Sequence, residues 1–311
     1  MDFEFSDDQR AILEALETLL ERHAGPARAI DLQTSGAYDN ELDEALRDAG
    51  FDDVARDSGA SSLEAALIAE AIARVAGGVA FAAGSLVAPA LSPEKIPGPV
   101  AICELGQNGP VRYASFARSL LLLDGEVAKV VDLVPGDVRP VESNFGYPMG
   151  ALVKDLSKGA RSLGPYSGEA LRRWWRLALA VETVGTMQGA LAQTVGYLKQ
   201  RKQFGQTIAS FQAVQHRLAE CAISVEGSRW LCLEAAHHGA PAEETATAAA
   251  YTMQAAGQVF AETHQLSGAI GYTREHDLHV FSMRLQALRL EFGGVAAHRR
   301  AVADERWGAG A

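Results

Sequence analysis

The chain has 311 residues, of which 48% are hydrophobic and 22% charged, and its formal net charge is −11 at pH 7. This length and composition can bury a sizeable hydrophobic core, in one large domain or in two to three smaller ones. The negative charge argues against nucleic-acid binding, because neutralising phosphates requires a basic surface. No apolar run reaches the length of a membrane span, and the N-terminus lacks the basic-then-apolar layout of a signal peptide. We therefore expect a soluble cytoplasmic protein.

Residues 1–95 read as a helical N-terminal domain. Ser6 is an N-cap candidate with acids behind it, and the apolar residues that follow recur at helical spacing as far as Gly25-Pro26. A second, short helix is predicted from Glu41 to Ala49. A third is capped by Ser61 or Ser62 and runs to about residue 75.

Prolines 89, 93, 97 and 99 precede a change to strand-like patterning, which predicts a reduced middle β domain over residues 96–165. Short apolar runs occupy 100–103 and 120–123, and Asp124-Gly125 between apolar segments is a strong hairpin signal. The strands are expected to end near Pro148. So few residues suffice for a minimal sheet but hardly for a closed barrel of eight strands.

From Ser167 onward the pattern is helical, which predicts a C-terminal bundle over residues 166–311. Long helices are expected on both sides of a break at Gly239-Ala240-Pro241, and shorter ones over 275–289 and 296–305. The predicted fold class is mainly α with a small β domain.

The segment from Arg201 to Gln212 is a cationic, amide-bearing turn between two long helical patterns. A guanidinium can bind a phosphate or a carboxylate through two parallel hydrogen bonds. Ser210, which precedes a Phe-x-x-Val pattern, is predicted to cap the following helix, whose first N–H groups would also face an anion. The chemistry predicts an anion site, and the alternative is an ordinary polar turn between helices.

Other chemical motifs point to no second kind of site. Cys103, Cys221 and Cys232 are odd in number and lack metal-ligand spacing, so we predict three buried, reduced thiols. His276 and His279 share a helix face, but no third ligand accompanies them, and we predict no metal site. Neither a Gly-rich dinucleotide fingerprint nor a nucleophile elbow is present.

Two stretches resemble the acyl-CoA dehydrogenase family in wording, order and spacing. The first is Tyr197 to Gly205 with its continuation Phe211 to Glu220, and the second is Gln265 to His279. The resemblance covers most of the chain when the N-terminal helices are included. It implies an N-terminal helical unit, a middle β unit and a C-terminal four-helix bundle, with FAD as the cofactor and an acyl-CoA thioester as the substrate.

In this family, FAD lies between the β domain and the bundle of one subunit, and the neighbouring subunit completes its pyrophosphate end. The resemblance therefore implies that Arg201 would pair with the pyrophosphate and that Phe204 would pack on the cofactor. Gln212, Gln265 and Gly268 would line the dinucleotide half. The second glycine of the family's Gly-Gly pair is Ala269 here.

The family's catalytic base is in many members a Glu before the last helix, and the matching segment here is Leu290-Glu291-Phe292-Gly293-Gly294. Phe292 occupies the base position in the simplest alignment and cannot accept a proton. Glu291 is a weak substitute, because neighbouring residues on a helix point about 100° apart. Glu182, on a helix face of bulky and tiny residues, is another weak candidate. For Glu182 we favour a structural ion pair or hydrogen bond over catalysis.

The middle unit also lacks the Thr- and Trp-bearing strands by which the family holds the flavin ring. Between Pro99 and Arg118 there is no Trp or Thr, and Ser115 is the one Ser. The resemblance thus implies that the chain keeps the residues that would contact a neighbouring subunit's cofactor. It lacks many of the residues that would hold a cofactor of its own. It resembles the shortened subunits of heterotetrameric acyl-CoA dehydrogenases of bacterial steroid side-chain degradation, with a homologous subunit as partner. The alternatives are a self-sufficient homo-oligomer that uses Glu182 or Glu291, and a non-catalytic scaffold.

Overall fold

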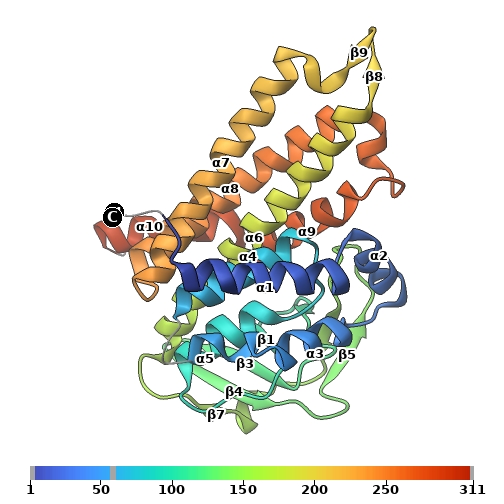
Figure 1. Cartoon of the computed structure of the whole chain (residues 1–311). Helices are drawn as coiled ribbons and strands as arrows, with labels where there is room; N and C mark the ends of the chain where they lie inside the picture. The colour runs from blue at the N-terminus through green and yellow to red at the C-terminus, as the bar shows by residue number, and fades with distance from the viewer. Residues whose placement is uncertain (1–3, 57–60, 309–311) are drawn as a thin grey trace.

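The computed structural model describes residues 4–56 and 61–308, and helices dominate it (Figure 1). Three long helices, α6, α7 and α8, extend beyond the part of the molecule where the N-terminal helices and two small sheets lie (Figure 1). The predicted fold class, mainly α with a small β part, is confirmed. Within the described ranges, no helix has the length and apolar character needed to cross a membrane.

The N-terminal helices begin where the sequence predicts caps. Ser6 and Ser61 each accept from the backbone of the first turn in a capping box. Helix α2 was not predicted: Pro26 was interpreted as a stop, but it is the first residue of a new helix, where proline loses no hydrogen bond. The elements are α1 (Asp7–His23), α2 (Pro26–Ser35), α3 (Asn40–Asp48), η1 (Phe51–Arg56), α4 (Ser62–Arg74), η2 (Ala82–Val87) and α5 (Ala88–Leu91).

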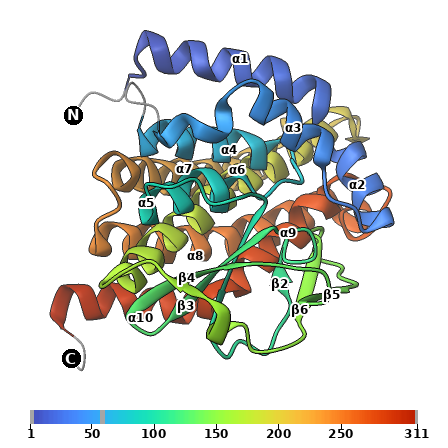
Figure 2. The same cartoon turned by 90° about the horizontal axis from the view of Figure 1, so that it is seen from below.

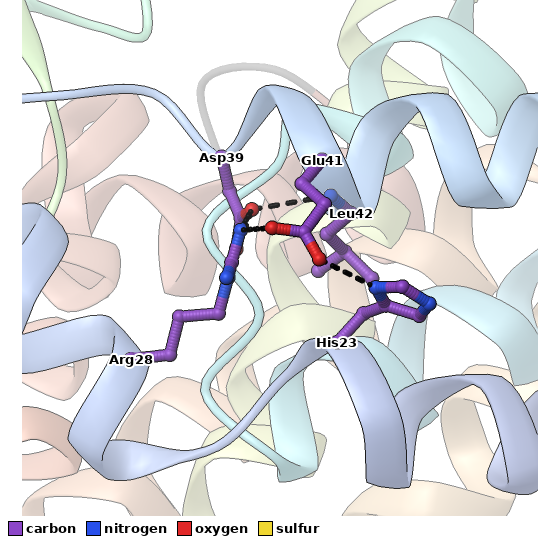
Figure 3. A network of polar contacts seen from close by, with 5 residues as sticks. All are labelled: His23, Arg28, Asp39, Glu41 and Leu42. Carbon is purple, nitrogen blue, oxygen red and sulfur yellow. Dashed lines mark hydrogen bonds and ion pairs between the residues drawn. The ribbon is translucent and has the colours of Figure 1, made fainter.

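A polar network joins the first three helices (Figure 3). Asp39, which is 1% exposed, caps α3 by accepting from the Leu42 N–H, and Arg28 of α2 donates to both of its oxygens at 2.7 and 2.9 Å. Glu41 accepts from Arg28 and contacts His23 at the end of α1 at 3.0 Å. His23 and Arg28 together lower the pKa of the Glu41 carboxyl. The network therefore ties α1, α2 and α3 to one another.

The β part consists of two sheets rather than one (Figure 2). Asp124-Gly125 turns the predicted hairpin, with Gly125 at φ +55°. The parallel pairing of β1 with β3 and the second sheet were not predicted, and strands continue past Pro148. The strands are β1 (Val100–Glu104), β2 (Val111–Arg112), β3 (Ser119–Asp124), β4 (Val127–Asp132), β5 (Val138–Val141), β6 (Met149–Leu152) and β7 (Arg161–Ser162), in the orders β1-β3-β4-β7 and β2-β6-β5.

Helix α6 lies at the centre of the fold, and buried side chains occur along most of its length. Gly185 and Gly189 let α4 approach closely. A Cβ at Gly185 would lie 2.1 Å from the Glu70 carbonyl oxygen, and a Cβ at Gly189 would lie 2.6 Å from the Arg74 carbonyl oxygen. The C-terminal elements are α6 (Ser167–Gln200), β8 (Lys202–Gln203), β9 (Gln206–Thr207), η4 (Ile208–Ser210), α7 (Gln212–His237), α8 (Ala242–Ser267), η5 (Gly268–Tyr272), α9 (Leu278–Leu290), η6 (Glu291–Gly293) and α10 (Gly294–Trp307).

Candidate functional site

The predicted anion turn is a two-stranded hairpin, β8–β9, between α6 and α7. Arg201 ends α6, with its N–H on the Tyr197 carbonyl, and its own carbonyl accepts from Ile208, which closes the base of the hairpin. Phe204 and Gly205 form the turn at φ +54° and +81°. Two residues in the left-handed region give the tight turn that suits strand twist, so the backbone holds Phe204 at the tip.

The β8–β9 hairpin projects from one end of the bundle, away from the rest of the chain (Figure 1). Phe204 is 89% exposed and touches Phe211 edge to face, with ring centroids 6.2 Å apart. Arg201 is exposed, and its guanidinium has no hydrogen bond or ion pair with any residue in 4–56 or 61–308. The hairpin therefore offers a cation and an aromatic ring that the chain itself does not use.

Other predicted cofactor residues also lie on the surface. Gln212 is the first residue of α7, Gln265 lies in the last turn of α8, and Gly268 ends α8 at φ +66°; all three are exposed. Figure 1 shows the end of α8 at the same end of the bundle as the hairpin. The prediction for Ser210 was wrong: its hydroxyl donates to the Thr207 carbonyl, and the N-cap of α7 is Phe211. Because the Ser210 hydroxyl is hydrogen-bonded within the short turn η4, it does not cap the start of α7.

Phe292, at the predicted base position, lies in η6 with a left-handed backbone at φ +51° and ψ +47°. Its ring stacks on Trp175 of α6, with centroids 4.3 Å apart, and the Arg176 guanidinium lies 5.3 Å from the ring centroid. A bulky side chain in this region is strained by about 1–3 kcal/mol, and surrounding packing must hold it there. The aromatic stack supplies that packing.

Beside this stack lies the Arg112 cluster, which we define as Arg112, Trp175, Glu182 and Glu291. Arg112 of β2 donates to both oxygens of Glu182 at 2.8 and 2.9 Å and, through Nε, to Glu291 at 2.9 Å. Trp175 Nε1 donates to the other Glu291 oxygen at 3.2 Å. The three charged side chains are only 10–19% exposed. Burial disfavours the Arg112 charge, but the two carboxylates outweigh it and raise the Arg112 pKa well above its ordinary value.

The Arg112 cluster decides what Glu182 and Glu291 can do. A carboxylate that accepts charge-assisted hydrogen bonds from a buried guanidinium is held in that ion pair and has to leave it before its oxygens can reach a substrate. Both weak candidates for the base share the same cation. Arg112 was missed in the sequence, although a lone Arg in a short apolar strand is a signal that it needs a carboxylate partner.

A cavity of about 530 Å³ opens beside the Arg112 cluster, with Trp175 and Phe292 on its wall. Its lining carries three carboxylates, Glu104, Glu142 and Glu291, against one guanidinium that is already neutralised. This charge balance does not suit a phosphate-bearing cofactor such as FAD. The exposed guanidinium and aromatic ring of the β8–β9 hairpin do suit the pyrophosphate end of one.

Comparison with known proteins finds acyl-CoA dehydrogenases. Residues 171–306 match the family model "Acyl-CoA dehydrogenase, C-terminal domain". The acyl-CoA dehydrogenase IpdE2 of Mycobacterium tuberculosis is 26% identical over 295 residues, which cover 89% of this chain and 91% of the relative. Residues 171–306 are therefore an acyl-CoA dehydrogenase C-terminal domain, and most of the chain is similar to an acyl-CoA dehydrogenase.

Solved acyl-CoA dehydrogenase structures share the whole fold. A chain of the ChsE4-ChsE5 complex from Mycobacterium tuberculosis superposes with a TM-score of 0.81 at 21% identity, covering 98% of both chains. A chain of the steroid ACAD variant Tcur3481-Tcur3483 gives a TM-score of 0.81 at 24% identity and covers 96% of this chain and 97% of its own. At these identities the likeness shows the fold.

The remaining predictions concern metals and thiols. No group of three or more His, Cys, Asp or Glu residues that could hold a metal ion occurs in the ranges that the structure describes. The prediction that His276 and His279 share a helix face was wrong: His276 lies before the start of α9, and its carbonyl accepts from His279 Nδ1. The three cysteines are buried and free, as predicted for small apolar residues.

Proposed function

We propose that this chain is one subunit of a hetero-oligomeric, FAD-dependent acyl-CoA dehydrogenase and supplies half of a shared cofactor site. In this proposal Arg201, Phe204, Gln212, Gln265 and Gly268 contact the dinucleotide end of a flavin whose ring is seated on a homologous partner. The observation that carries the proposal is the β8–β9 hairpin, which presents an unpaired guanidinium and an aromatic ring at 89% exposure.

The residues would act as follows. The planar guanidinium of Arg201 donates two N–H groups to pyrophosphate oxygens, and an exposed site keeps it available until the partner binds. The Phe204 ring covers the cofactor and excludes water from it. When bound, the flavin accepts the hydride that leaves the β-carbon of the acyl thioester. Abstraction of the α-proton falls to a carboxylate of the partner, because Phe292 cannot accept a proton.

The substrate class is proposed as an acyl-CoA thioester, in particular a steroid side-chain thioester. The similar Tcur3481-Tcur3483 chain belongs to a steroid ACAD, which supports the steroid assignment. Another similar chain belongs to the ChsE4-ChsE5 complex, which supports a hetero-oligomer.

The self-sufficient homo-oligomer is the weaker alternative. It requires Glu182 or Glu291 to leave Arg112, and either departure would strand a buried charge at a cost of about 3–5 kcal/mol. The non-catalytic scaffold is the other alternative, and it predicts that no flavin is kept under any condition.

The deciding experiment is an absorption spectrum of the chain purified alone and then co-purified with a homologous acyl-CoA dehydrogenase subunit from the same source. We expect flavin bands and acyl-CoA turnover only in the co-purified sample. Flavin bands of equal strength in the chain alone would favour the homo-oligomer. Flavin in neither sample, from a partner that does bind the chain, would favour the scaffold.

A further inference from the structure

Arg284 of α9 is a second buried cation, and it lacks a carboxylate partner. It is 3% exposed, its Nε donates to the Gly146 carbonyl at 3.2 Å, and its Nη1 donates to the Gly77 carbonyl at 2.9 Å. Its guanidinium carbon lies 4.9 Å from the Tyr147 ring centroid. Within residues 4–56 and 61–308, no Asp or Glu forms an ion pair with it, and Nη2 makes no hydrogen bond.

The contrast with Arg112 shows why this matters. Arg112 meets two carboxylates, whereas carbonyl oxygens and an aromatic face give Arg284 only partial compensation. The Arg112 cluster has one more carboxylate than guanidinium, and its Glu182 lines a small internal void together with Arg284, so it offsets the Arg284 charge without forming an ion pair with it. A bound anion would instead pair directly with Nη2 of Arg284, which makes no hydrogen bond within the described ranges.

Arg284 also lines a cavity of about 580 Å³. The cavity lies between α2, the 140–149 segment and α9; Phe292 does not line it, but the cavity shares residues 141–144 and Met149 with the cavity beside Phe292. Its volume falls in the range of small-molecule sites, about 300–1,000 Å³. There is therefore room for an organic ligand next to the unpaired cation.

The other charges on the cavity lining favour an anion as well. Arg274 adds a second guanidinium, and Glu142, which is exposed, is the one carboxylate among the described lining residues. Arg274 donates to the Asn144 side chain at 3.2 Å. His279 Nδ1 donates to the His276 carbonyl, so Nε2 of the neutral ring is an acceptor and adds no donor for an anion. In a chain of net charge −11, this is a locally basic, polar cleft.

We propose that the cavity between α2, the 140–149 segment and α9 binds a small organic anion, a carboxylate or a phosphate ester, whose charge pairs with Arg284. Nη2 of Arg284 donates to the anion from inside the cavity, and Arg274 binds it from the rim. The proposal is independent of the shared flavin site, because none of the residues in it belongs to the β8–β9 hairpin.

Calorimetric titration of the full chain with succinate and with inorganic phosphate, at matched ionic strength against chloride, tests the proposal. We expect saturable binding of at least one probe, and about tenfold or greater weakening in Arg284→Met. Arg289→Met is the matched control: Arg289 is on the same helix, donates to the Met253 carbonyl and does not line the cavity, so its loss should leave binding unchanged. Tighter binding of phosphate than of succinate would indicate a phosphate ester as the natural ligand, and the reverse a carboxylate.

Arg274→Ser, at the exposed rim, tests the same cavity without touching the core. It should weaken binding about threefold. The proposal is overturned if the wild-type chain binds neither probe saturably, or if Arg284→Met and Arg274→Ser both bind as tightly as the wild type. If Arg284→Met does not fold, Arg284→Lys, which keeps the charge but loses the planar fork, takes its place with an expected intermediate affinity.

Discussion

The β8–β9 hairpin and the Arg112 cluster use the same kinds of side chain in opposite ways. In the hairpin, Arg201 and Phe204 face solvent and find no partner within the described part of the chain. In the cluster, the Arg112 guanidinium donates to two carboxylates, and Trp175 stacks on the neighbouring Phe292. An arginine and an aromatic ring left unpaired are available to another molecule, whereas a paired set serves the fold. The hairpin is thus available for binding another molecule, whereas the cluster stabilises the fold.

The largest expected effect comes from breaking the Arg112 cluster. Arg112→Ala leaves Glu182 and Glu291 as uncompensated buried charges, so the free energy of unfolding should fall by about 3–5 kcal/mol. Urea denaturation at pH 7 measures it. Arg10→Ala is the matched control: its ion pair with Asp7 is exposed, so we expect a change under about 1 kcal/mol. A loss in Arg112→Ala no larger than in the control would mean that the cluster is solvated and does not brace the fold.

The free energy of unfolding should also fall in acid, because of the buried His298. This fully buried imidazole has no hydrogen-bond partner in the described ranges, and burial, followed by the Arg176 charge, lowers its pKa to about 4. The unfolded chain, with a pKa near 6.5, binds the proton first as pH falls. Stability from this group is therefore complete above pH 6.5, is lost as pH falls towards 4, and should drop by about 2 kcal/mol by pH 5.

Urea denaturation at pH 7.5 and pH 5 measures that loss. His298→Met, which keeps an apolar side chain of similar length, should reduce the difference between the two pH values by about the same 2 kcal/mol. An unchanged pH difference in the variant would show that other groups carry the acid sensitivity.

Substitutions in the exposed β8–β9 hairpin should change FAD retention and leave the stability of the fold unchanged. Arg201→Ala should weaken FAD retention in the assembled complex about ten- to a hundredfold, since a charge-assisted contact is worth about 1.5–3 kcal/mol. Arg201→Lys should recover part of the affinity, because an ammonium keeps the charge without the planar fork. Retention is measured by flavin absorbance after extensive dialysis. Complexes of Arg201→Ala that form normally and keep FAD at the wild-type level would remove the basis of the shared site.

The smallest expected effect on stability belongs to Phe204→Ala. At 89% exposure the ring contributes little to folding, so the free energy of unfolding of the isolated chain should change by less than about 0.5 kcal/mol. The same variant should assemble less well with a flavin-bearing partner, as measured by size-exclusion chromatography of the mixture. A destabilised isolated chain would mean that Phe204 packs on its own subunit.

Local signals in the sequence determined many of the helices and the exposed β8–β9 hairpin. Ser6 and Ser61 cap helices because their hydroxyls satisfy backbone donors within three residues, and Asp124-Gly125 turns a hairpin through its own backbone preferences. The exposed positions of Arg201 and Phe204 could likewise be anticipated, because the turn lies between two helices and its residues need no distant contact.

Tertiary structure alone decided how the buried charges are partnered. Arg112 meets Glu182, 70 residues away, and Glu291, 179 residues away, and no local pattern ties these positions together. The parallel pairing of β1 with β3 and the unpaired state of Arg284 are of the same kind. Which carboxylate reaches which cation depends on how helices and strands pack. The sequence can state that a buried charge needs a partner, but the fold selects the partner or leaves the place for a ligand.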